Sequence, residues 1–417
     1  MLAWFFMPKR FLFGAERTAN LRVPTFETLC FIDEPDEVAS VHKATGSVLL
    51  GGAGNAFLTP LLRDQSAFTL DGDRHKLARR IAGKWLTARA MQDSQPIIDA
   101  IIQQELDNWQ AAGRRDIGDW SRWLTMRILC KITLGIEDQA RVRRIYKRFE
   151  AATGYTANIV TYTKRFWAPR GIISTGHFVE FLVKRIDREL DQIIADGRAH
   201  LQNAPAENVL HGLIEAQQEH GYDNAFIRDN IAAILAAGYD TTGSALSWTM
   251  FWLARYTDKT ADPEAFRSEV LRYCPPVEIL PRRIAEHALE DACEIAPSIV
   301  SVASTSGDAG PLVCPCVHRV HHNPALYPDP ERFEPNRFAN QKAGSPDTYM
   351  PFGAGGRMCL GINLGKLVLD RTIALIWERN LQVQTNLRRF NPIRRNVSIW
   401  PGFVFRGRLQ PAQNKEG

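Results

Sequence analysis

In this chain of 417 residues, the residue best suited to carry out chemistry is a cysteine that follows a glycine-rich segment. Three glycines lie between positions 353 and 356, Cys359 follows, and apolar residues at helical spacing continue over 360–380. Glycine lets a backbone turn tightly and approach a flat ligand closely. A cysteine that opens a helix meets free backbone amides, which stabilise a thiolate. Arg357, two residues upstream, could meet a carboxylate of the same ligand.

A second chemical pattern interrupts the largely apolar stretch 231–256, which predicts a long helix buried on most sides. Gly238 weakens such a helix by about 1 kcal/mol relative to Ala, and a buried, unpaired Asp240 would cost several more. A small pair such as Ala237 and Gly238 lets a ligand press against the helix. A hydroxyl beside a carboxylate, here Thr241 beside Asp240, can relay protons. The alternative is a helix bend in which threonine bonds the backbone.

An acid and a base one helical turn apart form the third pattern. Glu269 and Arg272 have this spacing and precede the proline pair at 275–276. Glu264 and Arg267 have the same spacing without the prolines. Alone, either pair is typical of a solvated helix face.

Together these segments resemble the cytochrome P450 family over nearly the whole chain. The segment from Phe352 to Gly361 fits the family's cysteine-loop signature, phenylalanine-x-x-glycine-x-arginine-x-cysteine-x-glycine, at every fixed position. Three further segments precede it in the order typical of the family. They are the histidine-x-x-x-arginine helix start at 75–79, the threonine-containing helix at 237–242 and the glutamate–arginine helix before its proline pair. The segment 333–338 resembles the family's next element, with Asn336 in place of the usual glutamate.

The resemblance implies a haem b cofactor with Cys359 as the axial ligand of its iron, a thiolate that favours O–O cleavage. It implies that Phe352 packs beside the sulfur, that Ala237 and Gly238 make room for dioxygen, that Thr241 hydrogen-bonds the oxygen and that Asp240 supplies protons. Glu269, Arg272 and Arg337 would form a buried ion network that holds the cysteine loop. The haem contacts implied in full are His75, Arg79, Ala237, Gly238, Arg282, Phe352, Arg357, Cys359 and Gly361.

The pattern of apolar residues along the chain predicts a mainly α fold with a minor β portion, and the chain is expected to form one domain over 1–417. Strands are expected within 20–41 and 382–409, a loop over 50–62, and helices within 75–137, 140–218, 231–256 and 360–380. The haem is expected between the long helix at 231–256 and the helix after the cysteine loop. Two regions depart from the family pattern: the link between Thr242 and Glu269 is short, and 288–313 is long and weakly patterned.

Composition narrows the function. The net charge of +5 does not indicate nucleic-acid binding, and seven scattered cysteines favour a reducing, cytoplasmic compartment over a disulfide framework. The N-terminal apolar run is far shorter than the roughly 20 residues of a membrane span, so no transmembrane anchor is expected. The cysteines and histidines of 314–322 raise the alternative of a zinc or copper site, but the sequence has no second cysteine pair at the spacing of a zinc finger.

The expected function is a monooxygenase that inserts one oxygen atom of O2 into a hydrophobic substrate. No segment is left for a flavin domain, so electrons would come from a separate ferredoxin or flavodoxin with its reductase, docking near Arg357 and Lys366 on a monomer. Segments 57–62, 155–167 and 399–403 are expected to line an apolar pocket for a long-chain lipid or terpenoid, with Lys164 and Arg165 at its mouth. The alternatives are a haem-thiolate peroxygenase or isomerase and a non-catalytic haem-binding protein.

Overall fold

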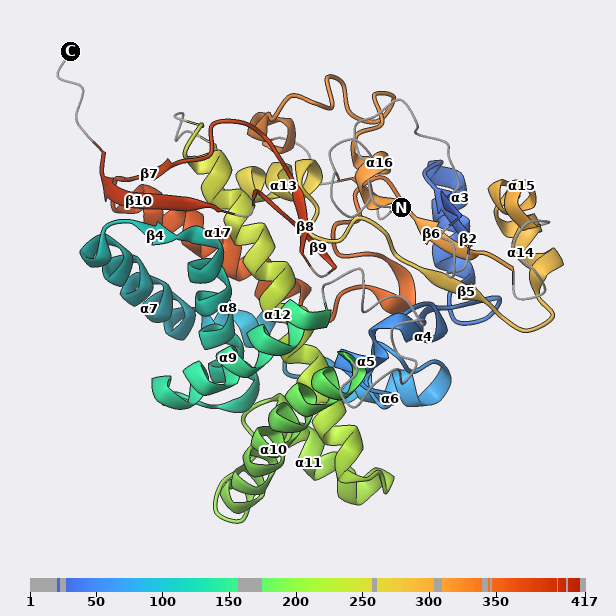
Figure 1. Cartoon of the computed structure of the whole chain (residues 1–417), viewed down its shortest axis with the longest axis horizontal. Coiled ribbons are helices and arrows are strands. Elements are labelled where there is room, and N and C mark those ends of the chain that lie inside the picture. The colour runs from blue at the N-terminus through green and yellow to red at the C-terminus, as the bar shows by residue number, and fades with distance from the viewer. Residues whose placement is uncertain are drawn as a thin grey trace.

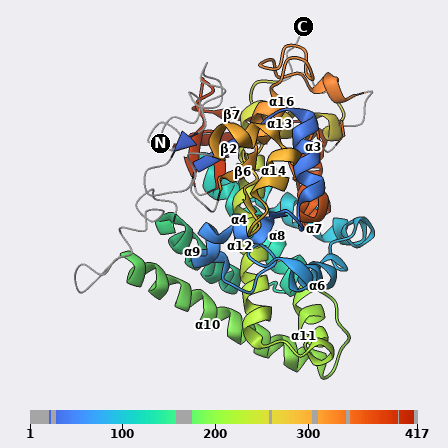
Figure 2. The same ribbon diagram turned by 90° about the vertical axis from the view of Figure 1, so that its right-hand side faces the viewer.

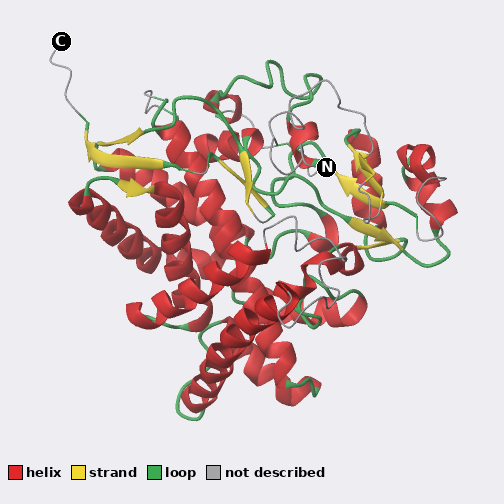
Figure 3. Cartoon of the chain, in the orientation of Figure 1, coloured by secondary structure: helices red, strands yellow, loops and turns green. Residues whose placement is uncertain are grey.

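The computed structural model describes residues 21–22, 28–156, 175–256, 261–303, 310–339, 344–345, 347–395, 397–402 and 404–412. Helices dominate it, and the strands are short (Figure 3). The helices are α3 (Pro35–Ala44), α4 (Gly51–Gly54), α5 (Thr59–Leu62), α6 (Gly72–Gly83), α7 (Ala88–Ala112), α8 (Ile117–Leu134), α9 (Gln139–Thr156), α10 (Thr175–Leu201), α11 (Val209–His220), α12 (Asn224–Leu253), α13 (Pro263–Tyr273), α14 (Leu289–Ile295), α15 (Val300–Ala303), α16 (Val317–His321) and α17 (Ile362–Glu378). None of the helices in the described ranges is long and apolar enough to cross a membrane.

The strands form three small sheets. They are β1 (Leu21–Arg22), β2 (Thr28–Ile32), β3 (Leu49–Leu50), β4 (Arg115–Asp116), β5 (Arg282–Ile284), β6 (Leu312–Pro315), β7 (Leu381–Thr385), β8 (Ile393–Arg395), β9 (Ser398–Trp400) and β10 (Arg406–Pro411). The largest sheet has the order β1-β2-β6-β5-β3, with β2 and β6 parallel. The sheet β4-β10-β7 lies at the opposite end of the molecule, and β8 pairs with β9 between them (Figure 1).

Helix α12 runs through the middle of the molecule (Figures 1 and 2). Its 30 residues start after Asp223, whose carboxylate caps the helix by accepting the amide of Phe226 at 3.0 Å. Most of its residues are buried, as the apolar stretch predicts, and it packs on α5, α8, α10, α13 and α17. The prediction of a long buried helix is therefore confirmed, and the helix begins seven positions earlier than expected.

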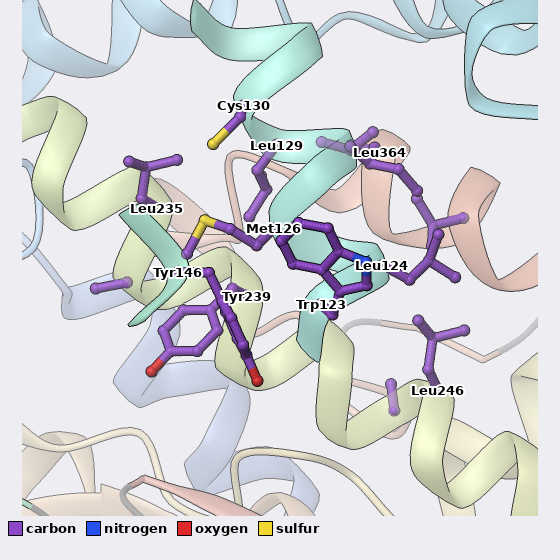
Figure 4. Close-up of a cluster of buried hydrophobic side chains, with 14 of the residues drawn as sticks. Trp123, Leu124, Met126, Leu129, Cys130, Tyr146, Leu235, Tyr239, Leu246 and Leu364 are labelled. Carbon is purple, nitrogen blue, oxygen red and sulfur yellow. The ribbon is translucent and has the colours of Figure 1, made fainter. Parts of the chain in front are cut away.

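The principal core lies between α8, α9 and α12. Trp123 and Met126 of α8, Tyr146 of α9, and Leu235 and Tyr239 of α12 meet there (Figure 4). Burying each large apolar side chain stabilises the fold by about 1.5–3 kcal/mol. This core holds α12 against α8 and so sets the position of the polar residues in its middle.

The N-terminal region contains the predicted strands, followed by a helix that was not predicted. Within 20–41 the described strands are β1 and β2, and Pro35 then starts α3, because proline suits the first turn of a helix. All five residues of β2 are buried, since apolar clusters cover both faces of the strand. The expected loop at 50–62 is instead a succession of short helical turns, α4, a 3-10 turn at Ala56–Leu58, and α5.

The stretch at 288–313, which departs from the family pattern, has a defined place where it is described. Residues 289–303 form α14, a 3-10 turn and α15. Their apolar residues Ala292, Ala296, Ile299 and Val302 are buried in one cluster with residues of β2, α3 and β6. The segment therefore covers one face of the five-stranded sheet. Residues 304–309 lie outside the description.

Candidate functional site

The cysteine loop is closed by its own backbone. Gly353 and Gly355 have φ of 68° and 61°, a region that favours glycine. A Cβ on Gly355 would lie 3.0 Å from the carbonyl oxygen of His42, so α3 also requires a glycine there. The amide of Cys359 donates to the carbonyl of Phe352 at 2.8 Å, which brings the two signature residues together.

Helix α17 begins at Ile362, three residues after the cysteine, so Cys359 lies before the helix rather than on its first turn. The side chain is accessible, but the surrounding protein still desolvates it, and this burial raises the pKa of the Cys359 thiol. A hydrogen bond from the amide of Gly361 and the nearby charge of Arg79 act in the opposite direction. The loop therefore favours the thiol until a cation binds the sulfur, which is how a metal deprotonates a cysteine.

Cationic side chains gather around this loop. Arg79 donates to the carbonyl of Met358 at 2.7 Å, next to Cys359. Arg282 is buried, donates to the hydroxyl of Thr45 at 3.2 Å and to the carbonyl of Pro281 at 2.9 Å, and burial lowers its pKa to about 10. Within the described residues, neither of these two guanidiniums donates to a carboxylate. Arg282, rather than its half-buried neighbour Arg283, thus fits the predicted position.

His75 belongs to the same cluster. Its ring is buried on α6, and no described residue forms a hydrogen bond with its Nε2 atom. Burial, followed by the charges of Arg357 and Arg79, lowers the pKa of His75 to about 4. A buried ring nitrogen without a partner beside several cations indicates a place for an acceptor with negative charge.

Arg357 is oriented by α6 and the segment before it. Its guanidinium donates to the carboxylate of Asp71, to the carbonyl of Leu70 at 2.5 Å and to that of Ala67 at 3.0 Å. Asp71 also accepts the amides of Gly52 and Ala53, each at 2.9 Å. The arginine side chain is only 9% exposed, so it offers little surface of its own to a docking protein. Lys366 is only partly exposed as well, and burial lowers its pKa.

One face of α12 remains partly accessible in the middle of this otherwise buried helix. Ala237, Gly238, Thr241 and Thr242 share it at helical spacing. A Cβ on Gly238 would lie 2.8 Å from Leu129 of α8, so close helix packing also requires this glycine. The hydroxyl of Thr241 donates to the carbonyl of Ala237 at 2.7 Å, which is the threonine-to-backbone bond expected for a helix bend. The lone pairs of the hydroxyl oxygen can still accept a bond from a further donor.

Asp240 points to a different partner. It is buried, and its Oδ2 atom accepts the hydroxyl of Ser398 in β9 at 2.8 Å. The preceding residue, Tyr239, shares a hydrogen bond with Thr153 of α9 at 2.5 Å. The carboxylate thus has the satisfied hydrogen bond that a buried charge needs.

The predicted ion network forms. Arg272 donates to both carboxylate oxygens of Glu269, at 2.7 and 2.8 Å, and neither side chain is exposed. Arg337 lies 3.6 Å from the same carboxylate, and the amide of Glu334 donates to it at 2.8 Å. Arg272 also donates to the carbonyls of His321 and Pro330, both at 2.9 Å. The network ties α13 to the segments on either side of residue 330.

The cysteines and histidines of 314–322 have structural partners. The ring of His321 stands between Met350, whose amide donates to Nε2 at 2.9 Å, and the carbonyl of Arg272, 3.2 Å from Nδ1. His318 stacks on His322 with ring centroids 3.9 Å apart. In the described part of the chain no three His, Cys, Asp or Glu side chains are grouped so that they could hold a metal ion.

The predicted pocket segments are only partly described. Leu58, Leu61 and Leu62 pack into the principal core, while Phe57 is exposed. Ile399 and Trp400 of β9 are buried, and Arg122 of α8 lies 5.1 Å above the Trp400 ring. Residues 157–167, with Lys164 and Arg165, lie outside the described residues, as does Phe403.

Sequence reasoning did not identify Asp71, His42 or Ser398 as parts of the site. His42 lies under the cysteine loop, 3.4 Å from the sulfur of Met350, and burial lowers its pKa to about 4. The Arg267 side chain, set aside as a surface pair, is buried and donates to Asp370 of α17 at 2.6 Å. The only signal for Asp71 was its place directly before the helix that starts at Gly72.

Comparison with known proteins shows the class. The cytochrome P450 family model matches residues 23–261 and 264–398. Cytochrome P450 135B1 of Mycobacterium tuberculosis is 28% identical over 383 residues, covering 84% of this chain and 76% of that protein. Mouse cytochrome P450 4X1 is 24% identical over 383 residues, covering 80% and 72%.

Solved structures agree. Retinoic acid-bound cyanobacterial CYP120A1 superposes with a TM-score of 0.75 at 20% identity, covering 93% of this chain and 90% of that one. P450BioI, in complex with an acyl carrier protein carrying hexadec-9Z-enoic acid, gives 0.71 at 15% identity, covering 96% and 97%. These likenesses concern the fold. With the family match they show that the chain belongs to the cytochrome P450 family. It is therefore a haem-thiolate monooxygenase.

Proposed function

We propose that the protein binds haem b through the thiolate of Cys359 and uses O2 to hydroxylate or epoxidise a hydrophobic substrate. The observation that carries the proposal is the gathering of Arg79, Arg282 and His75, whose Nε2 atom has no partner among the described residues, around the cysteine loop. A haem needs a thiolate for its iron and cations for its two propionates, and both kinds of group meet here. Arg357 would complete the set, with Asp71 holding it in place.

When bound, the haem supplies the activation of dioxygen. The protein's residues position the reactants and protons. Arg79, Arg282 and His75 would hold the propionates, and Phe352 would pack beside the sulfur. Thr241 would offer its hydroxyl to dioxygen from the accessible face of α12, and Asp240 would hold the proton that the reaction consumes. This pair favours a monooxygenase over a peroxygenase, an isomerase or a non-catalytic haem protein, because only the first needs protons delivered to oxygen.

The electrons would come from a separate ferredoxin or flavodoxin. The surface that best supports docking is α6, whose last turns adjoin the cysteine loop through Arg79 and Met358. Lys76, Arg80 and Lys84 are exposed and spaced four residues apart, so they form one cationic face, and Met358 is exposed beside it. A cationic face attracts an acidic partner, and the attraction is screened by salt.

The proposed substrate is a long-chain lipid, with a fatty acid preferred over a terpenoid. P450BioI is described with a hexadecenoyl group, which supports the fatty acid, whereas CYP120A1 is described with retinoic acid, an elongated terpenoid acid; both ligands are long and apolar. Titrating fatty acids of increasing length into the ferric protein tests this, since a ligand that displaces water from the iron shifts the Soret band. A steroid or cyclic terpenoid that shifts the band when no fatty acid does would reverse the preference.

The test of the proposal as a whole is Cys359→Ala. Thiolate ligation gives the ferrous carbonyl adduct a red-shifted Soret band, and this variant should lose it. A red-shifted band that persists unchanged would show that another residue binds the iron. Turnover of any substrate with a competent reductant would exclude the non-catalytic alternative, and sustained turnover by the isolated chain with NADPH would exclude the separate partner.

A further inference from the structure

The contact between α12 and β9 leads beyond the residues that the family resemblance supplies. β9 is fixed to α12 at one backbone oxygen: the carbonyl of Ile399 accepts the hydroxyl of Ser244 at 2.6 Å and the indole N–H of Trp248 at 2.7 Å. The amide of Ile399 donates to the carbonyl of Pro276 at 3.1 Å. With its middle residue held in this way, β9 has a defined position on the helix.

The residue before this anchor is Ser398, which is completely buried. Its hydroxyl donates to Oδ2 of Asp240 at 2.8 Å. A hydrogen bond to a carboxylate in a buried place is strong and directional. It restricts rotation of the Asp240 side chain.

We propose that Ser398 is the positioning residue for Asp240, holding the carboxylate at the orientation from which it serves Thr241 and the reacting oxygen. This inference rests on the proposed function of Asp240. The position of Ser398 follows from that of β9, which stays bound through the Ile399 carbonyl to Trp248 and through the Ile399 amide to Pro276 when the Ser244 hydroxyl is removed.

The matched variants are Ser398→Ala and Ser244→Ala. Each removes one hydroxyl from a fully buried serine at the same contact between α12 and β9, but only Ser398 touches Asp240. In the haem-loaded protein with reductant and substrate, Ser398→Ala should lower the product formed per electron by about ten-fold, the ratio that corresponds to losing one hydrogen bond to a charged group. Ser244→Ala should stay near the parent protein, and Ser398→Thr, which keeps the hydroxyl, should restore the yield.

A second measurement does not depend on turnover. The infrared band of the Asp240 carboxyl, assigned by its loss in Asp240→Asn, should shift in Ser398→Ala and not in Ser244→Ala. If Ser398→Ala does not take up haem, Ser398→Cys fills the same space with a weaker donor and should give the same changes.

The outcomes separate this inference from the proposed function. A Ser398→Ala yield equal to that of the parent, with a clear loss in Asp240→Asn, overturns the role of Ser398 alone. A yield that is equal in Asp240→Asn and the parent overturns the proposed role of Asp240, and the inference with it. Equal losses in Ser398→Ala and Ser244→Ala, with no infrared shift, would show that Ser398 only supports the fold.

Discussion

Replacing Glu269 by glutamine would leave the buried guanidinium of Arg272 without its counter-ion. The carboxylate accepts two bonds from Arg272 and one from the amide of Glu334, and Arg337 lies at 3.6 Å. The amide of a glutamine would turn at least one donor towards another donor. Breaking a fully buried ion pair from one side costs about 3–5 kcal/mol, so Glu269→Gln should lower the free energy of unfolding by that amount.

The chain offers a matched control in the same helix. Glu264 pairs with Arg267 at the same spacing, 2.8 Å apart, but its side chain is 71% exposed. Exposed pairs contribute at most about 1 kcal/mol, and Arg267 keeps its bond to Asp370. Urea unfolding of the haem-loaded variants, followed by the Soret band and by circular dichroism, measures both changes. Similar, small losses in Glu269→Gln and Glu264→Gln would refute the reasoning.

Three further predictions follow from the site. Thr241→Ala should leave haem binding intact and divert electrons into hydrogen peroxide, because the hydroxyl that would hold oxygen is gone. Thr242→Ala on the same face should not divert electrons. Equal coupling of electrons to product in Thr241→Ala and the parent would remove Thr241 from the mechanism. Lys76→Glu should slow reduction by a ferredoxin or flavodoxin and weaken the salt dependence of the rate. Lys147→Glu on α9 should have neither effect. Stopped-flow reduction rates that are the same for both variants would argue against docking at α6. Burial lowers the pKa of His321 to about 3 from its usual 6.5, so between these pH values the unfolded chain takes up a proton that the folded protein does not. The contribution of His321 to stability is complete above pH 6.5 and is lost as the pH falls, by about 2 kcal/mol at pH 5. Denaturant titrations in which the unfolding free energy of His321→Gln falls with pH as steeply as that of the parent would contradict this.

The sequence was sufficient where a function depends on neighbours in the chain. The cysteine loop, the α12 motif and the Glu269–Arg272 pair are local patterns, and their elements lie close to the predicted positions. Other features depend on residues far apart. Asp71 meets Arg357 across 286 positions and Ser398 meets Asp240 across 158, and no local pattern indicates either pair.

One local pattern was misinterpreted. Glycine and proline within 50–62 indicated a loop, but four-residue helices tolerate both, and Pro60 lies at the start of α5. The strand expected within 20–41 forms as β2, but its burial on both faces, which comes with the parallel pairing to β6, was not part of the prediction. Burial on two sides depends on what the rest of the chain brings to the strand, which periodicity does not report.

The parallel pairing of β2 with β6 also has a consequence for biosynthesis. Leu29 pairs with Leu312, about 280 positions later, and Trp109 donates to the carbonyl of Gly407 across 298. Domains generally fold as units during synthesis from the N-terminus, and pairings between distant segments form slowly. Strand β2 must therefore leave the ribosome long before β6 exists, with its four apolar residues uncovered. The cysteine loop is made later still, so capture of the cofactor belongs to the last stage of folding.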